Sequence, residues 1–410
     1  MKKSIFKSVT VLICLAFLSG CAAADRSGSR DHTEKLSEES GYADSKMSDG
    51  RKTEDDYETD DIDIESDEKQ SVRNRMSELG ALCKDIYIRA DKGGSSNIVL
   101  DEETVHTMTE TAAEQGWAVT CGSYDHNMLN YEEVDQALRD AAEGESSQTE
   151  FYEITTSGYF RYFQLSAEDR ELTVTYANAA YNDDMDLQIR QLEKFRVYDW
   201  EYTEKGWLIW EKALSKNQEM DMHSFFRILP LDEKCREMCD RYILPVSYFC
   251  NNLFLTDWDA GSMDRIEFND LYEFLYEMKY GEKLDEEAAA GGIPKAQFEE
   301  VVLTYFDISV EQLEKYARYD AAAGVYPWEP VNAWNRVRQV QPFPEVVRCV
   351  EDQDGTLTLY VEGILIVAGD DCAFRHRVTM RERDGGWVYV ANDIDEDSGN
   401  APGYRPRREF

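Results

Sequence analysis

Residues 151–181 read FYEITTSGYFRYFQLSAEDRELTVTYANAAY, and this stretch decides the fold class. It is rich in β-branched and aromatic residues, a composition typical of strands. Two similar runs follow, IRQLEKFRVYDWEYT at 189–203 and GWLIWEKAL at 206–214, with the turn signal Glu204-Lys205-Gly206 between them. The succession predicts an antiparallel β-meander.

Upstream of these strands the apolar residues recur at helical spacing instead. The first such helix is expected between residues 71 and 90 on the apolar positions Val72, Met76, Leu79, Cys83 and Ile86. A second helix is expected to begin after the N-cap Asp101, and a third after Asn130, in a capping-box arrangement with Glu133. Three helices therefore precede the meander.

The second half of the chain repeats this plan. Pro294 is expected in the first turn of one helix, and Ser309 with Gln312 caps the next. Strand patterns follow at 345–352, 356–367, 373–383 and 386–394. We therefore predict an α+β fold in which helices are followed by an antiparallel β-meander, twice along the chain, by analogy with cystatin-like or NTF2-like units.

Both predicted meanders end on a strand that opens with Gly-Trp, namely Gly206-Trp207 and Gly386-Trp387. A duplicated unit explains this pair, and so does convergent patterning, because a hairpin with Gly-Trp is a common packing solution. The pattern alone leaves both explanations open.

The N-terminal segment has the features of an export signal. Three lysines precede an apolar run, Val9–Leu18, which is too short to span a bilayer, since that requires roughly 20 apolar residues. The sequence Leu18-Ser19-Gly20-Cys21 then resembles the lipobox of bacterial lipoproteins. This resemblance implies cleavage before Cys21 and lipid attachment to its thiol.

Residues 21–70 are built from Ser, Gly, Asp and Glu, and they lack apolar periodicity. Such a composition buries too little apolar surface to offset the entropy of ordering. We therefore expect a signal peptide at 1–20, a lipidated and disordered acidic tether at 21–70, and α+β units at 71–260 and 261–410.

Charge limits the possible partners. The chain carries 83 acidic and 44 basic residues, a formal net charge of −39 at pH 7. A nucleic-acid-binding protein needs a basic stripe to neutralise phosphates, so no nucleic acid partner is expected.

The seven cysteines of residues 71–410 are an odd number, so at least one thiol stays free. Cys235, Cys239 and Cys250 lie close in sequence but lack the usual zinc-knuckle spacing and a clear fourth ligand. Buried free thiols are favoured over disulfides, and no metal or cofactor is expected.

No nucleophile elbow, phosphate-binding loop or dinucleotide fingerprint occurs in the sequence, and no catalytic residues are expected. His376 lies in a strand pattern where it shares a face with Phe374 and Val378, an arrangement typical of a hydrogen-bonded core histidine. The acidic clusters at 257–259 and 393–397 lack the glycine and the final glutamate of a calcium loop, so we interpret them as turn and cap residues.

Longer stretches resemble known sequences. RILPLDEKCREMCDRYILPVSYFCNNLFLTDWD, IPKAQFEEVVLTYFDISVEQLEKYARYDAAAGVYPW and PEVVRCVEDQDGTLTLYVEGILIVAGDDCAFRHRVTMRERDGGWVYVAND are similar to a family of uncharacterised lipoproteins of Gram-positive gut clostridia. The similarity runs from about residue 151 to the end. It implies a location on the outer face of the cell membrane and no particular activity.

The sequence therefore predicts a membrane-anchored extracytoplasmic lipoprotein that acts as a non-catalytic binding or interaction module. Its expected partners are the membrane, through the lipid anchor, and an envelope protein, peptide or glycan. The alternative is an extracytoplasmic hydrolase that acts on glycans or peptides through paired carboxylates, whose spacing depends on the fold.

Overall fold

The computed structural model describes residues 61–94, 97–122, 127–212, 223–332, 335–337, 340–395, 398 and 401–408. Met1–Tyr57 and Glu58–Phe410 form two units, and the described residues all belong to the second. The signal segment, Cys21 and the tether as far as residue 60 lie outside the described residues. In the described ranges, no helix combines the length and apolarity that crossing a membrane requires.

The first part of the described chain folds into three helices and a seven-stranded sheet. In order, its elements are α1 (Ser66–Arg89), α2 (Glu102–Ala113), β1 (Val119–Cys121), α3 (Glu132–Glu143), β2 (Ser147–Ile154), β3 (Phe160–Glu168), β4 (Glu171–Tyr181), β5 (Leu187–Tyr202), β6 (Trp207–Lys212) and β7 (His223–Arg227). Strands β2 to β7 pair antiparallel in sequence order, so the predicted meander is confirmed. The short β1, which was not predicted, pairs parallel with β2.

The second part has the same order of helices before strands. Its elements are α4 (Glu233–Met238), the π-helical turn η2 (Cys239–Ile243), η3 (Met263–Arg265), α5 (Phe268–Tyr280), α6 (Glu286–Ala289), β8 (Ile293–Pro294), α7 (Lys295–Tyr305), α8 (Val310–Tyr316), β9 (Val325–Tyr326), β10 (Phe343–Glu351), β11 (Thr356–Leu365), η4 (Ile366–Ala368), β12 (Asp370–Arg383) and β13 (Gly386–Ile394). Strands β10 to β13 form an antiparallel sheet in sequence order, and β8 pairs with β9. The predicted α+β class, helices followed by a meander, is confirmed in both parts, while the unit boundary at residue 260 stays a prediction.

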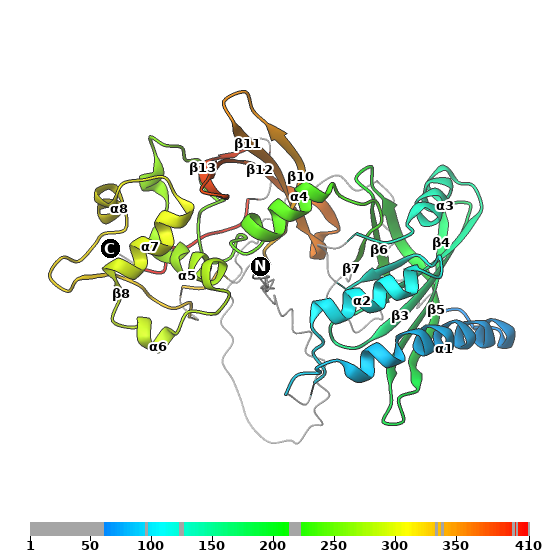
Figure 1. Ribbon diagram of the computed structural model, residues 1–410. Coiled ribbons are helices and arrows are strands. Elements are labelled where there is room, and N and C mark those ends of the chain that lie inside the picture. The colour runs from blue at the N-terminus through cyan, green and yellow to red at the C-terminus, as the bar shows by residue number, and fades with distance from the viewer. Residues whose placement is uncertain are drawn as a thin grey trace, which may run out of the picture. The chain divides into compact units, whose positions relative to one another are not determined.

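The two faces of the first sheet bury different helices, as its strand alternation requires. Tyr152 packs in one core with residues of α1 and α2, whereas the adjacent Phe151 packs in another core with residues of α3. Figure 1 shows α1 and α2 lying across the sheet beside β3 and β5. The sheet is thus covered on both sides.

Two of the helix caps predicted from the sequence are confirmed, and one is wrong. Asp101 caps α2 by accepting a hydrogen bond from the Thr104 N–H, and Ser309 with Gln312 forms the expected capping box. The capping box predicted for Asn130 is wrong. Its φ is +53°, and its side-chain amide donates to the carbonyl oxygens of Ala113 and Trp117, so it closes the end of α2 instead.

Helix α1 begins earlier than the sequence indicated. The sequence predicts that residues 61–70 belong to the disordered tether, but α1 starts at Ser66 and Ile64 is buried. The Glu68 carboxylate accepts hydrogen bonds from Thr175 and Lys194 at 2.8 and 3.0 Å. These long-range contacts order residues whose local composition favours disorder.

The two Gly-Trp pairs have different roles. Gly206 has φ +86°, and a Cβ there would lie 2.3 Å from the Cβ of Leu229, so only glycine fits this close approach. Trp207 beside it is fully buried. In the second meander the positive φ falls on Gly385, and Trp387 is only partly buried.

Candidate functional site

His376 is part of a closed polar chain in the core of the second sheet. It is 2% exposed, its Nε2 lies 3.0 Å from the Tyr248 hydroxyl, and its Nδ1 lies 2.7 Å from Oδ1 of Asn392. The Asn392 amide donates to the Thr256 carbonyl at 2.9 Å. Since Oδ1 can only accept, Nδ1 carries the proton and Nε2 accepts from the tyrosine.

The environment of His376 is that of a residue that stabilises the fold, and it does not favour a role as a general acid or base. Burial lowers the pKa of His376 from 6.5 to about 4, so the ring is neutral at physiological pH. Phe374 and Val378 are also fully buried, as expected for residues on the same face. Both ring nitrogens of His376 have partners within the protein, so neither is available for proton transfer in this arrangement.

The same strands line a charged cavity of about 480 Å³, and His376 is one of its lining residues. Its lining includes Glu362, Arg377 and Asp393. Arg377 forms an ion pair with Asp393, and Lys205 Nζ lies 2.6 Å from Oε2 of Glu362. These three charges are compensated within the protein, whereas Arg375, which also lines the cavity, is exposed.

The fold brings the two acidic clusters together. Trp258 and Asn392 form an antiparallel bridge, so Asp257 lies opposite Asp393, whereas Asp259 points away along the chain from the second cluster. Oδ1 of Asp257 accepts the Ile394 N–H at 2.7 Å, and Oδ1 of Asp259 accepts from Gly261 and Ser262. Glu396 and Asp397 lie outside the described residues. Across the described ranges, no group of three or more His, Cys, Asp or Glu residues is placed to hold a metal ion.

The most enclosed carboxylate at the junction of β7 and β10 is also committed to a partner. Glu345 is 4% exposed, and its Oε1 lies 3.6 Å from Nε of Arg227. Burial raises the pKa of Glu345, against the opposing effect of that arginine. It lacks the access to substrate that a hydrolytic carboxylate needs.

The seven described cysteines are free thiols, five of them buried. Among the described residues, Cys235, Cys239 and Cys250 do not belong to a group placed to hold a metal ion. The Cys239 thiol donates to the Pro344 carbonyl at 3.5 Å, while Cys250 offers its own carbonyl to Arg407.

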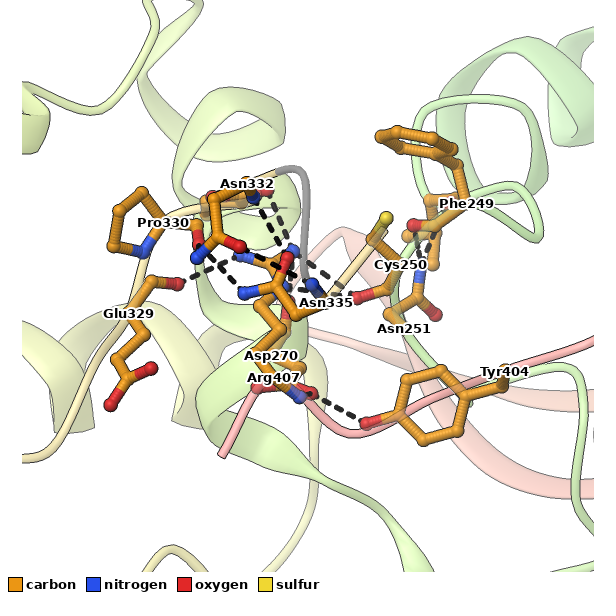
Figure 2. A network of polar contacts seen from close by, with 12 residues as sticks. Phe249, Cys250, Asn251, Asp270, Glu329, Pro330, Asn332, Asn335, Tyr404 and Arg407 are labelled. Atoms are coloured by element: carbon orange, nitrogen blue, oxygen red, sulfur yellow. Dashed lines mark hydrogen bonds and ion pairs between the residues drawn. The ribbon is translucent and has the colours of Figure 1, made fainter. Parts of the chain in front are cut away.

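Sequence reasoning missed a buried knot around Arg407, which Figure 2 shows from close by. The Arg407 side chain is 1% exposed, and its guanidinium donates to Glu273 and to the carbonyls of Cys250, Asp270 and Glu329. Asp270 in turn accepts from the Tyr404 hydroxyl at 2.5 Å and from the Arg407 N–H at 3.0 Å. The knot fastens the C-terminal segment to α5 and to two loops.

All of these donors and acceptors are internal to the protein. Burial raises the pKa of Asp270, while the Tyr404 hydroxyl and Arg407 act to lower it. With its hydrogen-bonding capacity used in this way, the knot is an anchor for the fold and offers no group to a ligand.

An open groove between α1 and β5 differs from the Arg407 knot, because its charged groups are exposed and not paired within the described part of the protein. It measures about 520 Å³ and is lined by Arg73, Met76, Leu187, Gln188, Ile189, Arg190, Gln191 and Leu192. Its two charged lining residues, Arg73 and Arg190, are both exposed. Within the part of the chain that the structure describes, neither arginine forms an ion pair or a hydrogen bond.

Strand β5 supplies two further features of this groove. Its register with β4 slips between Ile189 and Gln191, so Arg190 is the extra residue of a β-bulge, which redirects a side chain. On its other edge, β5 pairs with β6 only from Val197 onward. The Ile62 N–H donates to the Lys194 carbonyl at 2.7 Å, which demonstrates that this edge accepts an extended segment.

The fold and these features define an α+β protein with helix-covered sheets, buried polar networks and, among the described residues, a groove whose charged lining is positive. The chain belongs to the family described as Family of unknown function (DUF6070), whose model matches residues 69–407. No curated protein matches the chain.

One solved structure is similar, an "Ntf2 like protein involved in plasmid conjugation". It is 9% identical, the match covers 61% of this chain and 76% of the other, and the TM-score is 0.14. A similarity at that level carries no argument about function.

The buried imidazole makes the stability of the protein depend on pH. In the unfolded chain the pKa of His376 returns to about 6.5, so between pH 6.5 and 4 the unfolded state binds a proton that the folded state excludes. Stability therefore falls as the pH is lowered through this window, by roughly 3 kcal/mol from this residue. Urea unfolding at pH 7 and pH 4 measures the change.

The variant His376→Gln is expected to lose this part of the pH dependence. The matched control is His106→Gln, since His106 is exposed on α2 and its substitution leaves the buried contacts of His376 intact. If His376→Gln does not fold, an NMR titration of the wild-type ring tests the same point. A ring that titrates near 6.5 in the folded protein contradicts the prediction.

Replacing Arg407 tests the knot. Arg407→Ala leaves Glu273 and Asp270 without their buried cation, and breaking one side of a buried pair destabilises by roughly 3–5 kcal/mol. Arg408→Ala is the matched control, because Arg408 pairs with Glu329 at the surface, where such a pair contributes about 1 kcal/mol or less. Denaturant unfolding compares the two, and equal losses would refute the anchoring role.

Proposed function

We propose that this protein is a lipid-anchored extracytoplasmic lipoprotein whose folded part acts as a non-catalytic binding module. The anchoring part rests on the lipobox pattern at Leu18–Cys21, on the preceding lysines and apolar run, and on the resemblance to lipoproteins of Gram-positive gut clostridia. An acyl chain on Cys21, with a second on the new amino terminus, would hold the protein firmly at the membrane.

The groove between α1 and β5 carries the binding part of the proposal. In a chain of net charge −39, a groove whose lining charges are two exposed, unpaired arginines attracts an anionic group. Guanidinium groups bind carboxylates in a bidentate manner and with more geometric specificity than ammonium groups do. Met76, Leu187 and Ile189 give the groove an apolar lining as well. This lining would contact apolar side chains of a ligand in which apolar and acidic residues alternate.

The exposed edge of β5 indicates that the ligand has an extended backbone. Asp61 and Ile62 already lie against Phe195 and Lys194 as an antiparallel bridge. An extended peptide adding to the neighbouring edge would gain backbone hydrogen bonds as well as side-chain contacts. We therefore expect the ligand to be an extended acidic peptide segment of an envelope protein.

Lipid attachment can be tested at the residue that would carry it. Cys21→Ser should abolish incorporation of an alkyne-labelled fatty acid and release the protein from the membrane fraction, because only the cysteine offers a thiol. Cys14→Ser, in the same N-terminal segment, is the matched control and should behave as the wild type. Equal labelling of the Cys21→Ser variant and the wild type would exclude this anchor.

The groove can be tested with a defined probe, a fluorescein-labelled octapeptide of alternating valine and glutamate. Anisotropy with the full chain in detergent should report binding, and Arg73→Gln or Arg190→Gln should weaken it by roughly tenfold or more, since hydrogen bonds to charged groups contribute about 1.5–3 kcal/mol.

Arg381→Gln is the matched control, because Arg381 is an exposed arginine on β12 outside the groove. It should bind the probe as the wild type does, and an alternating valine–lysine peptide should not bind. Wild-type binding that survives the loss of both groove arginines would place the ligand elsewhere.

A further inference from the structure

Helix α4 lies along strand β10, as Figure 1 shows, and polar contacts fix their alignment at both ends. At one end, Lys234 Nζ lies 2.6 Å from Oε1 of Glu351. At the other end, the Cys239 thiol donates to the Pro344 carbonyl at 3.5 Å. The helix therefore runs antiparallel to the strand between these two points.

Two cysteines face each other between these contacts. Cys349 pairs with the fully buried Leu359 on β11, and it packs against the core that contains Cys235. The two thiol groups interact directly, side chain to side chain. They lie more than 100 positions apart in the sequence, so only the fold brings them together.

Their surroundings allow a reaction. Cys235 is 3% exposed, whereas Cys349 is partly exposed at the rim of the core. A small oxidant can therefore reach the Cys349 thiol first, and the buried Cys235 thiol can react with Cys349 in a second step. Cys239 differs, because its thiol is committed to a backbone carbonyl.

We infer that Cys235 and Cys349 are a redox-active pair that forms an intramolecular disulfide on exposure to a small-molecule disulfide. The inference does not depend on the groove or on lipid attachment.

The reaction is a balanced exchange of thiol and disulfide. The thiolate of Cys349 attacks one sulfur of the external disulfide and releases one thiol, leaving a mixed disulfide on Cys349. The thiolate of Cys235 then attacks the Cys349 sulfur and releases the second thiol. Two electrons pass to the external disulfide, and the protons of the two cysteines end on the two released thiols.

The bond would join α4 to β10 across a long loop of chain. Cross-links that close long loops restrict the unfolded state, so the oxidised protein should resist unfolding better. Burial raises the pKa of both thiols, which keeps them protonated and makes the exchange slow at neutral pH.

The test uses the full chain, purified in detergent after reduction and then incubated with oxidised glutathione. Free thiols are alkylated, and peptide mapping without reduction locates disulfides. We expect a Cys235–Cys349 cross-linked peptide and a melting temperature roughly 5–10 °C above that of the reduced protein. Adding a thiol reductant should reverse both.

Cys239→Ser is the matched control, because it removes a cysteine one helical turn away and should leave the cross-link and the thermal shift intact. Cys235→Ser and Cys349→Ser should each abolish both. Alkylation of both cysteines after incubation of the folded wild type would overturn the inference. So would glutathione held on Cys349 without the cross-link, or a bond between Cys235 and Cys239.

Discussion

Pairing buried carboxylates with arginines is the constraint on which the arrangement of this chain depends. In the described ranges Glu153, Asp270 and Glu345 are the buried acidic residues, and Arg161 and Arg227 pair with the first and last. Asp270 accepts the main-chain N–H of Arg407, whose guanidinium pairs with the neighbouring Glu273. A buried charge without a partner is strongly unfavourable. With 83 acidic and only 44 basic residues, the chain has few cations to place, so each such arginine helps to decide where a strand or a terminal segment docks.

The same constraint distinguishes the charged residues that stabilise the fold from those that we propose to bind a ligand. Charges that hold the fold are compensated internally, as in the Arg407 knot and in the cavity on β12, where Arg377 faces Asp393. His376, enclosed with Tyr248 and Asn392, follows the same rule for a neutral polar group. Arg73 and Arg190 at the α1–β5 groove differ from these residues, since they are exposed and have no partner among the described residues, and we propose that they bind a ligand.

Predictions that rested on local physics were accurate. The alternating β-branched and aromatic runs formed the meanders, and Asp101 and Ser309 cap their helices, because a cap involves residues only three positions apart. Asn130 failed because its amide bonds to carbonyls of the preceding helix end, a partner that no local pattern reveals. The start of α1 was misplaced for the same reason, since Glu68 is ordered by Lys194.

The sequence by itself determined the α+β class and the order of helices and meanders, while the absence of a nucleic acid partner and the lipid anchor at Cys21 stay its predictions. These follow from periodicity, composition and short motifs, which are encoded locally. Only the tertiary structure decided that His376 is buried, that Arg73 and Arg190 line the same groove, and that Cys235 lies next to Cys349. The partners in each case come from distant parts of the chain, and their meeting depends on how the helices pack on the sheets.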